Sequence, residues 1–167
     1  AYDKYGWVII CSSYTKTLAP DLRVGWMEAG RFSERVKNLK FTSTVAEPAL
    51  ITESIGLFLE SGNYDLHLRH LRRLYEKNII QLSSYSLQHF PHGTVVSRPS
   101  CGFILWVTLP VQVDCVRLFH SALAEKIVSM PGLLCSGENM FRNCLRIAVC
   151  FELNTAYLSG IYRLGQL

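Results

Sequence analysis

The chain has 167 residues, of which 49% are hydrophobic and 18% charged, and its formal net charge at neutral pH is +4. This composition is typical of a folded globular protein and excludes a disordered or low-complexity chain. The sequence holds no run of 18 apolar residues and no basic segment followed by an apolar one at its start. We therefore expect neither a membrane span nor a signal peptide, and infer a cytoplasmic protein.

A cluster of polar side chains lies between two apolar runs near the start of the chain. The apolar run at 7–10 predicts a strand, and the second run lies at 24–26. Between them Lys16 is surrounded by hydroxyl side chains and an arginine, namely Ser12, Ser13, Thr15, Thr17 and Arg23. Because loops that leave strands present polar groups to ligands in α/β proteins, the segment predicts an anion-binding loop that contains an amine. An ordinary solvated loop is the alternative, and residue spacing alone leaves both open.

Helices dominate the next part of the sequence. Apolar spacing predicts helices at 31–41 and from Pro48 to about residue 59. A long helix is expected at 64–88, because this stretch contains no glycine or proline and carries apolar residues every three or four positions. It also carries a group of basic side chains, Arg69, His70, Arg72, Arg73 and Lys77. Without a DNA-reading motif these predict a solvated helix face more than a nucleic-acid patch.

The remainder of the chain alternates between strands and helices. The predicted elements, in order, are a β-hairpin of strands at 94–97 and 102–109, a helix capped by Asp114 and ending near Lys126, a loop at 130–132, a strand at 143–150, and a helix at 154–164. In the last strand, alternation places Leu145, Ile147 and Val149 on one face and Arg146 on the other.

Cysteines and histidines are the candidate metal ligands of this chain. The six cysteines contain no C-x-x-C pair. The two histidine pairs, each spaced three residues apart, have no cysteine or acidic residue nearby at the sequence spacing of metal ligands. We therefore expect free, buried thiols and no metal site. The cysteines are Cys11, Cys101, Cys115, Cys135, Cys144 and Cys150.

Residues 13–26, Ser-x-Thr-Lys-Thr-Leu-Ala-Pro-x-Leu-Arg-Val-Gly-Trp, resemble the cofactor-lysine segment of the fold-type I pyridoxal-phosphate aminotransferases. The stretch Thr-Leu-Ala-Pro-x-Leu-Arg is most similar to the aminotransferase-like domain of MocR-type transcriptional regulators in the GntR superfamily. The resemblance implies that Lys16 forms a Schiff base with pyridoxal phosphate and that Ser13, Thr15 and Arg23 hold the phosphate. Asp21 departs from the small residue that the family tends to have at its position.

A second segment, Asn-x-Leu-Arg-Ile at 143–147, resembles the aminotransferase strand whose arginine binds the substrate α-carboxylate. An exposed strand arginine is the alternative for Arg146, and the resemblance favours the carboxylate role, which suits a two-pronged guanidinium. The family's acid against the pyridine nitrogen and its ring-stacking aromatic both precede the lysine by many residues. Neither can be assigned in this chain, where Asp3 and Asp21 are the only nearby acids.

The resemblance implies an α/β fold in two parts. Residues 1–65 correspond to the C-terminal part of the large cofactor-binding domain, and 66–167 to the small α+β C-terminal domain, with the long helix 64–88 as connector. The chain also starts without methionine and is expected to be a fragment.

The same resemblance predicts the effector-sensing, pyridoxal-phosphate-binding domain of a MocR/GntR-type regulator. We expect an amino acid or related effector, a homodimer in the full-length protein, and contact with DNA only through a separate N-terminal domain. Two alternatives stay open, namely a metabolic aminotransferase that transfers an amino group to a 2-keto acid, and an inert fragment without cofactor. Whether the chain is an enzyme is likewise left open.

Overall fold

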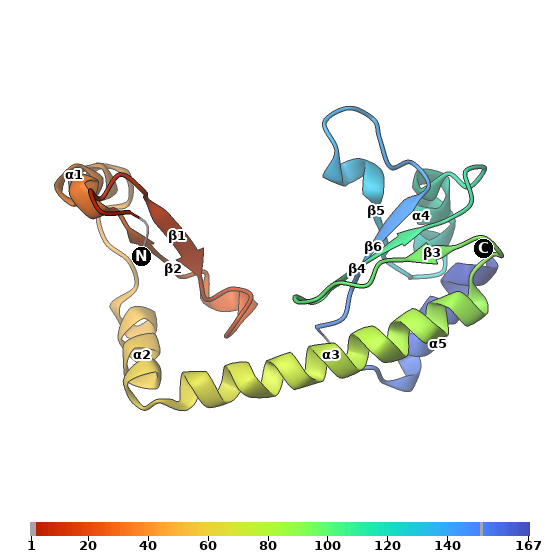
Figure 1. Ribbon diagram of the computed structural model, residues 1–167, viewed down its shortest axis with the longest axis horizontal. Coiled ribbons are helices and arrows are strands. Elements are labelled where there is room, and N and C mark those ends of the chain that lie inside the picture. The colour runs from red at the N-terminus through yellow and green to blue at the C-terminus, as the bar shows by residue number, and fades with distance from the viewer. Residues whose placement is uncertain (1–2, 151) are drawn as a thin grey trace. The chain divides into compact units, whose positions relative to one another are not determined.

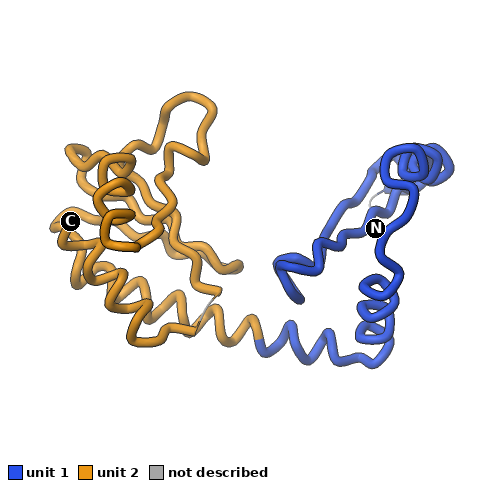
Figure 2. The backbone as a smooth tube through the Cα atoms, turned by 180° about the vertical axis from the view of Figure 1, so that it is seen from behind, with its two compact units in different colours: residues 1–70 blue, residues 71–167 orange. Residues whose placement is uncertain are grey.

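The computed structural model describes residues 3–150 and 152–167 (Figure 1). The chain divides into two compact units, Ala1–His70 and Leu71–Leu167, which are coloured separately in Figure 2. Helix α3 (Asn63–His89), the long helix predicted at 64–88, contributes its first turns to the first unit and the rest to the second.

The first unit contains a two-stranded antiparallel sheet (Figure 1). Strand β1 (Ile10–Ser13) pairs with β2 (Gly25–Glu28), and the register places Ser13 opposite Gly25. The strand predicted at 7–10 is therefore wrong in position, since only its last residue belongs to β1. The physical reason is Asp3, whose carboxylate accepts hydrogen bonds from the backbone N–H groups of residues 7 and 8, so that these donors are taken up locally rather than by a neighbouring strand.

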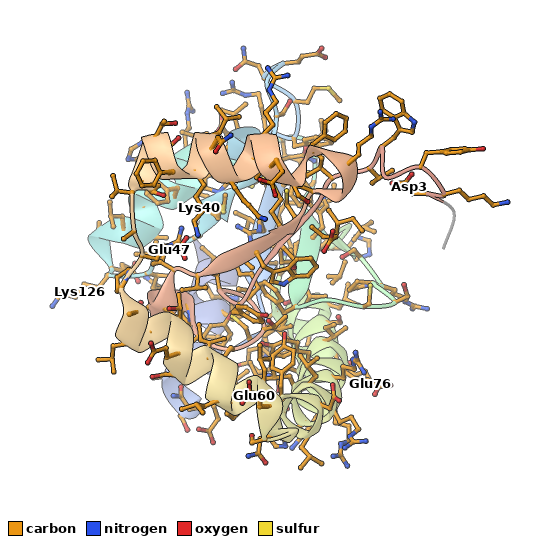
Figure 3. All side chains as sticks on the ribbon, turned by 90° about the vertical axis from the view of Figure 1, so that its left-hand side faces the viewer. Asp3, Lys40, Glu47, Glu60, Glu76 and Lys126 are labelled. Atoms are coloured by element: carbon orange, nitrogen blue, oxygen red, sulfur yellow. The ribbon has the colours of Figure 1, made fainter. Side chains whose placement is uncertain are left out.

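Helices α1 (Ser33–Thr44) and α2 (Ala49–Glu60) follow, with short 3-10 turns at Pro20–Leu22 (η1) and Gly30–Phe32 (η2). The helix predicted at 31–41 thus begins at residue 33, because the preceding turn is a 3-10 helix. Across the α1–α2 connection, Nζ of Lys40 lies 3.1 Å from Oε1 of Glu47, and Figure 3 shows the two side chains next to each other.

The first unit has little apolar interior of its own. Among its described residues, Ala29 and Ile55 are the apolar side chains that are buried, whereas large apolar side chains of the sheet are exposed. The exposed group includes Ile10, Trp26 and Met27, from both strands of the hairpin.

The second unit is a four-stranded antiparallel sheet covered by helices. In sheet order the strands are β3 (Val95–Val96), β4 (Ile104–Thr108), β6 (Cys144–Ala148) and β5 (Met130–Pro131). Strands β3 and β4 form the predicted hairpin. Met130 and Pro131, predicted as a loop, instead pair with Arg146 and Leu145 as a short edge strand.

The hydrophobic core lies in the second unit. It combines one face of β4 and β6 with side chains of α3, α4 (Cys115–Ala124) and α5 (Thr155–Gln166). The predicted faces of this strand are confirmed, since Leu145 and Ile147 of β6 and Val149 just beyond it are buried, while Arg146 is only half-buried. The predicted cap is also confirmed, because Oδ1 of Asp114 accepts the N–H of Val116 at 2.9 Å.

The cysteines are free, but they are not all buried. Cys115 and Cys144 lie in the core region, whereas Cys11, Cys101 and Cys135 are exposed, so the prediction of buried thiols is wrong for these three. Cys11 lies on the thin two-stranded sheet, and the other two lie where no second layer covers them, in the β3–β4 connection and at the end of a 3-10 turn. In the part of the chain that is described, no helix is both long and apolar enough to cross a membrane.

Candidate functional site

The Lys16 loop, residues 14–24, connects β1 to β2. The backbone N–H of Tyr14 donates to the carbonyl of Val24 at 2.9 Å, which extends the hairpin just beyond Ser13. The chain then turns back at once, because the Tyr14 carbonyl lies within hydrogen-bonding distance of three N–H groups, those of Thr17, Leu18 and Ala19, at 3.3, 2.8 and 3.3 Å. Lys16 therefore lies inside a tight turn directly after a strand, as predicted.

Arg23 closes the Lys16 loop. The 3-10 turn η1 precedes it, and its φ of 51° places it in the left-handed region, where the chain reverses into β2. A Cβ at Gly25 would lie only 2.7 Å from the Ser12 carbonyl oxygen, so the two strands approach too closely here for a side chain at 25. The register thereby brings Ser13 and Arg23 to the same end of the sheet, which is also the end that carries Lys16.

The charges of the Lys16 loop are not neutralised within the described part of the chain. Lys16, Arg23 and Ser13 are exposed, and Thr15 is half-buried. Neither cation forms an ion pair or a side-chain hydrogen bond with another described residue, and the exposed Asp21 forms none either. Two cations on this loop, with the hydroxyls of Thr15 and of Ser13 at the end of β1, fit a phosphate, and a primary amine fits an aldehyde. The donor chemistry of these residues thus fits pyridoxal phosphate.

Two side chains of α3 contact the Lys16 loop at Thr17, and neither was predicted from the sequence. The hydroxyl of Tyr64 donates to Oγ1 of Thr17 at 2.7 Å, and Nε2 of His67 lies 2.9 Å from the Thr17 carbonyl oxygen. Because a carbonyl oxygen can only accept a hydrogen bond, the 2.9 Å contact means that Nε2 of His67 carries the hydrogen and donates it. The three-residue spacing of Tyr64 and His67, which puts them on one helix face, is the signal that the sequence holds for them.

Arg146, the second predicted site residue, lies in the second unit in the middle of β6. Its cross-strand neighbours are Trp106 on β4 and Met130 on β5, and its Nη1 lies 2.9 Å from the Met130 sulfur. The side chain lines a cavity of about 440 Å³. Ser129 lines the same cavity, and its buried hydroxyl has no hydrogen-bond partner among the described residues.

Two side chains hold the end of β6 just after Arg146. The Tyr157 hydroxyl donates to the carbonyl of Ala148 at 2.6 Å, and the Asn78 side-chain amide donates to the carbonyl of Val149 at 2.9 Å. Burial, and to a lesser extent the nearby Cys150, raises the pKa of Tyr157 to about 12, so this phenol remains a donor across the ordinary pH range.

Asp3, one of the two acids near the lysine in sequence, is engaged locally. Hydrogen bonds from the backbone N–H groups of Val8 and Trp7, with a longer one from Tyr5, hold the pKa of its carboxyl below the usual value. Its role in this structure is thus to stabilise the segment before β1. Within residues 3–150 and 152–167, no group of three or more histidine, cysteine or acidic residues is placed to hold a metal ion.

Comparison with known proteins relates nearly the whole chain to two kinds of protein. No protein-family model matches it. Over 166 residues it is 31% identical to the uncharacterized HTH-type transcriptional regulator YjiR of Escherichia coli K12, an alignment that covers 99% of this chain and 35% of YjiR. Over 168 residues it is 29% identical to the uncharacterized aminotransferase SSO0104 of Saccharolobus solfataricus, covering 99% of this chain and 42% of that protein. The chain thus spans about a third of the regulator and two fifths of the aminotransferase.

Among solved structures, the fold matches that of LysN, the α-aminoadipate aminotransferase of Thermus thermophilus, crystallised with N-(5′-phosphopyridoxyl)-L-leucine. The TM-score is 0.83 at 26% sequence identity, and the match covers 95% of this chain and 41% of LysN. This match confirms the α/β fold expected from the sequence.

Proposed function

We propose that this chain is the effector-sensing, cofactor-binding part of a MocR-type transcriptional regulator. It is a member of the fold-type I pyridoxal-phosphate aminotransferase family, and MocR-type regulators are among its relatives. The observation that carries the proposal is the Lys16 loop. Its lysine, arginine and hydroxyls are gathered at one end of a hairpin, and no described acid neutralises the two cations.

Each residue of the loop has a distinct role in this proposal. When bound, pyridoxal phosphate supplies an aldehyde and an electron-withdrawing ring that acidifies the Cα hydrogen of an amino acid. Nζ of Lys16 would hold the cofactor covalently through its aldehyde carbon, with the aldehyde oxygen leaving as water. The hydroxyls of Ser13 and Thr15 donate to the phosphate, and the guanidinium of Arg23 offsets its charge. The Lys16 amine would also be the base that accepts a proton from Cα.

Arg146 binds the carboxylate of the effector in this proposal. A guanidinium offers two parallel N–H donors, so it fixes the orientation of an amino acid as well as attracting its charge. The half-buried setting of Arg146 and the cavity beside it support this role. Arg146→Lys keeps the charge but loses the two-pronged geometry, and we expect it to weaken effector binding at least tenfold in the full-length protein. Equal affinity in the two proteins would contradict the role.

We assign residues 1–65 to the C-terminal part of the large cofactor-binding domain and 66–167 to the small domain, with α3 as the connector. The hydrophobic core within 71–167 supports this assignment for the second part. The sparse burial and exposed sheet of the first unit support a larger domain in which further chain covers the hairpin.

We also propose a second subunit, DNA and a small effector as the partners of the full-length protein. The full-length protein is a cytoplasmic homodimer that binds DNA through a separate N-terminal domain and responds to an amino acid or related effector. SSO0104 and LysN favour the second candidate, a metabolic aminotransferase. A third is a piece of protein that folds but binds no cofactor.

Cofactor binding is tested by adding pyridoxal phosphate to the full-length protein and recording its visible absorbance. We expect a lysine–cofactor band in the wild type and in Lys4→Ala, which removes an exposed lysine outside the loop, and no band in Lys16→Ala. Borohydride reduction and mass spectrometry should place the added mass on Lys16. A wild type without a band, or a band that survives in Lys16→Ala, would contradict the proposal.

Sensing is separated from catalysis by supplying an amino donor and a keto acid, L-glutamate and pyruvate, to the cofactor-loaded protein. The regulator function predicts that amino acids change DNA binding while no alanine accumulates. Steady formation of alanine with no effect on DNA binding would identify a metabolic aminotransferase instead.

A further inference from the structure

Thr17, the residue directly after Lys16, is held at two atoms by a single helix. Its side-chain oxygen accepts the Tyr64 hydroxyl at 2.7 Å, and its carbonyl oxygen accepts Nε2–H of His67 at 2.9 Å. Both donors belong to the first turns of α3, within the first unit. Two hydrogen bonds to one residue, one on its side chain and one on its main chain, restrict that residue's rotation as well as its position.

Tyr64 also contacts the loop on the other side of Lys16. Its ring packs edge-on against the ring of Tyr14, with centroids 5.9 Å apart and planes at 80°. Tyr14 is itself fixed, since its N–H is bonded to Val24 and its carbonyl accepts three N–H groups of the turn. The main chain is therefore anchored at Tyr14, two residues before Lys16, and at Thr17, directly after it, and Tyr64 takes part in both anchors.

The His67 ring has support from α2. The ring of Phe58 packs edge-on against it, with centroids 6.5 Å apart and planes at 78°. The imidazole is half-buried, in contrast to the exposed His70 one turn later on α3. The helix is therefore covered at His67 and no longer covered at His70.

From these contacts we infer that Tyr64 and His67 are positioning residues for Lys16, acting through Thr17. The inference rests on the proposed function, in which Nζ of Lys16 bonds to the cofactor. The Lys16 side chain has a flexible four-carbon stem, is exposed, and forms no ion pair or side-chain hydrogen bond with another described residue. Fixing the main chain on both sides reduces the volume that Nζ explores, which lowers the ordering cost of covalent attachment.

The test uses conservative variants of the full-length protein with matched controls. Tyr64→Phe removes the hydroxyl but keeps the ring on Tyr14, and Tyr5→Phe is its exposed control. His67→Leu removes the donor, His67→Gln restores a side-chain N–H that can reach a carbonyl, and His70→Leu is the control on the same helix.

The first measurement needs no cofactor. Hydrogen–deuterium exchange at 17–19 should become about five- to tenfold faster in Tyr64→Phe and His67→Leu, because each loses a hydrogen bond that holds the turn. Exchange in β1 and β2 should stay as in the wild type, and the two controls should not change. Unchanged exchange at 17–19 would overturn the inference even if the cofactor binds.

The second measurement is the lysine–cofactor absorbance band as a function of pyridoxal phosphate concentration. Half-saturation should move about five- to tenfold higher in Tyr64→Phe and His67→Leu and return toward wild type in His67→Gln, a rescue that loss of folding does not produce. A wild-type band with no shift in these variants would overturn the inference alone. Absence of the band in the wild type would overturn the proposed function, and the inference with it.

Discussion

The side-chain amide of Asn78, on α3, donates a hydrogen bond to the carbonyl oxygen of Val149, 2.9 Å away, at the point where β6 has just ended. Asn78 is 3% exposed and Val149 is fully buried. A buried polar side chain is tolerated when it is hydrogen-bonded, as Asn78 is to the Val149 carbonyl. This hydrogen bond connects α3 to the end of the strand that carries Arg146.

Replacing Asn78 by leucine should lower the free energy of unfolding by about 1–3 kcal/mol, because it leaves the Val149 carbonyl buried without this donor. Urea unfolding followed by circular dichroism measures the change. Gln81→Leu removes an exposed amide from the same helix and should change stability by less than about 0.5 kcal/mol. If both variants were equally stable, the contact would contribute nothing.

Two glycines of α5 should respond in opposite directions to alanine. A Cβ at Gly165 would lie 2.6 Å from both the His89 carbonyl oxygen and a ring carbon of Phe90, whereas a Cβ at Gly160 would meet nothing within 4 Å. We expect Gly165→Ala to destabilise the chain by about 1–3 kcal/mol through overpacking and Gly160→Ala to stabilise it by about 0.5–1 kcal/mol through helix propensity. Thermal melts of the two variants would refute this packing if they moved in the same direction.

The Asp114 carboxyl should make stability depend on pH in the acidic range. A hydrogen bond from Arg142, at 2.6 Å, and the N–H of Val116 hold its pKa below the ordinary value of 3.8. Because the folded value is the lower one, this stabilisation is complete above 3.8 and is lost as pH falls through the folded value. Melting temperature should therefore drop on acidification.

Asp114→Asn keeps a helix cap but does not titrate, so its melting temperature should fall less steeply below about pH 4. Glu138→Gln, which alters an exposed acid of the same unit, is the control and should follow the wild-type curve. Parallel curves for Asp114→Asn and wild type would show that the Arg142 contact does not persist in solution.

Thiol reactivity should divide the cysteines by burial. Burial raises the pKa of Cys115 to about 12, so almost none of it is thiolate at pH 8, whereas the three exposed cysteines are accessible. Titration with dithionitrobenzoate should show rapid reaction of Cys101 and Cys135 in the second unit, and Cys101→Ser should remove one rapid thiol while Cys115→Ser removes none. Rapid reaction of Cys115 would contradict the packing of the second unit.

Local sequence was enough to predict the elements whose causes are local. Helix α3 follows from a stretch without glycine or proline, and the cap at Asp114 follows from a single side chain next to its own helix. The buried face of β6 follows from alternation. The start of β1 could not be predicted from the local pattern, because the Asp3 carboxylate accepts hydrogen bonds from the N–H groups of Trp7 and Val8.

Features that depend on residues distant in sequence could be determined only from the tertiary structure. Met130 and Pro131 are a strand because β6 lies beside them, and a two-residue strand has no pattern of its own. Three cysteines are exposed because no second layer covers them, which apolar neighbours in sequence do not reveal.

The candidate site divides in the same way. Ser13, Lys16 and Arg23 lie within eleven consecutive residues, so their chemistry and their resemblance to a cofactor lysine are visible in the sequence by itself. Tyr64 and His67 are 47 and 50 residues from Thr17, and only the folded chain brings them to it. The sequence by itself determined which groups are candidates for binding a cofactor, and the tertiary structure decided which side chains contact the residue after Lys16, because hydrogen bonds join atoms by their distance in space.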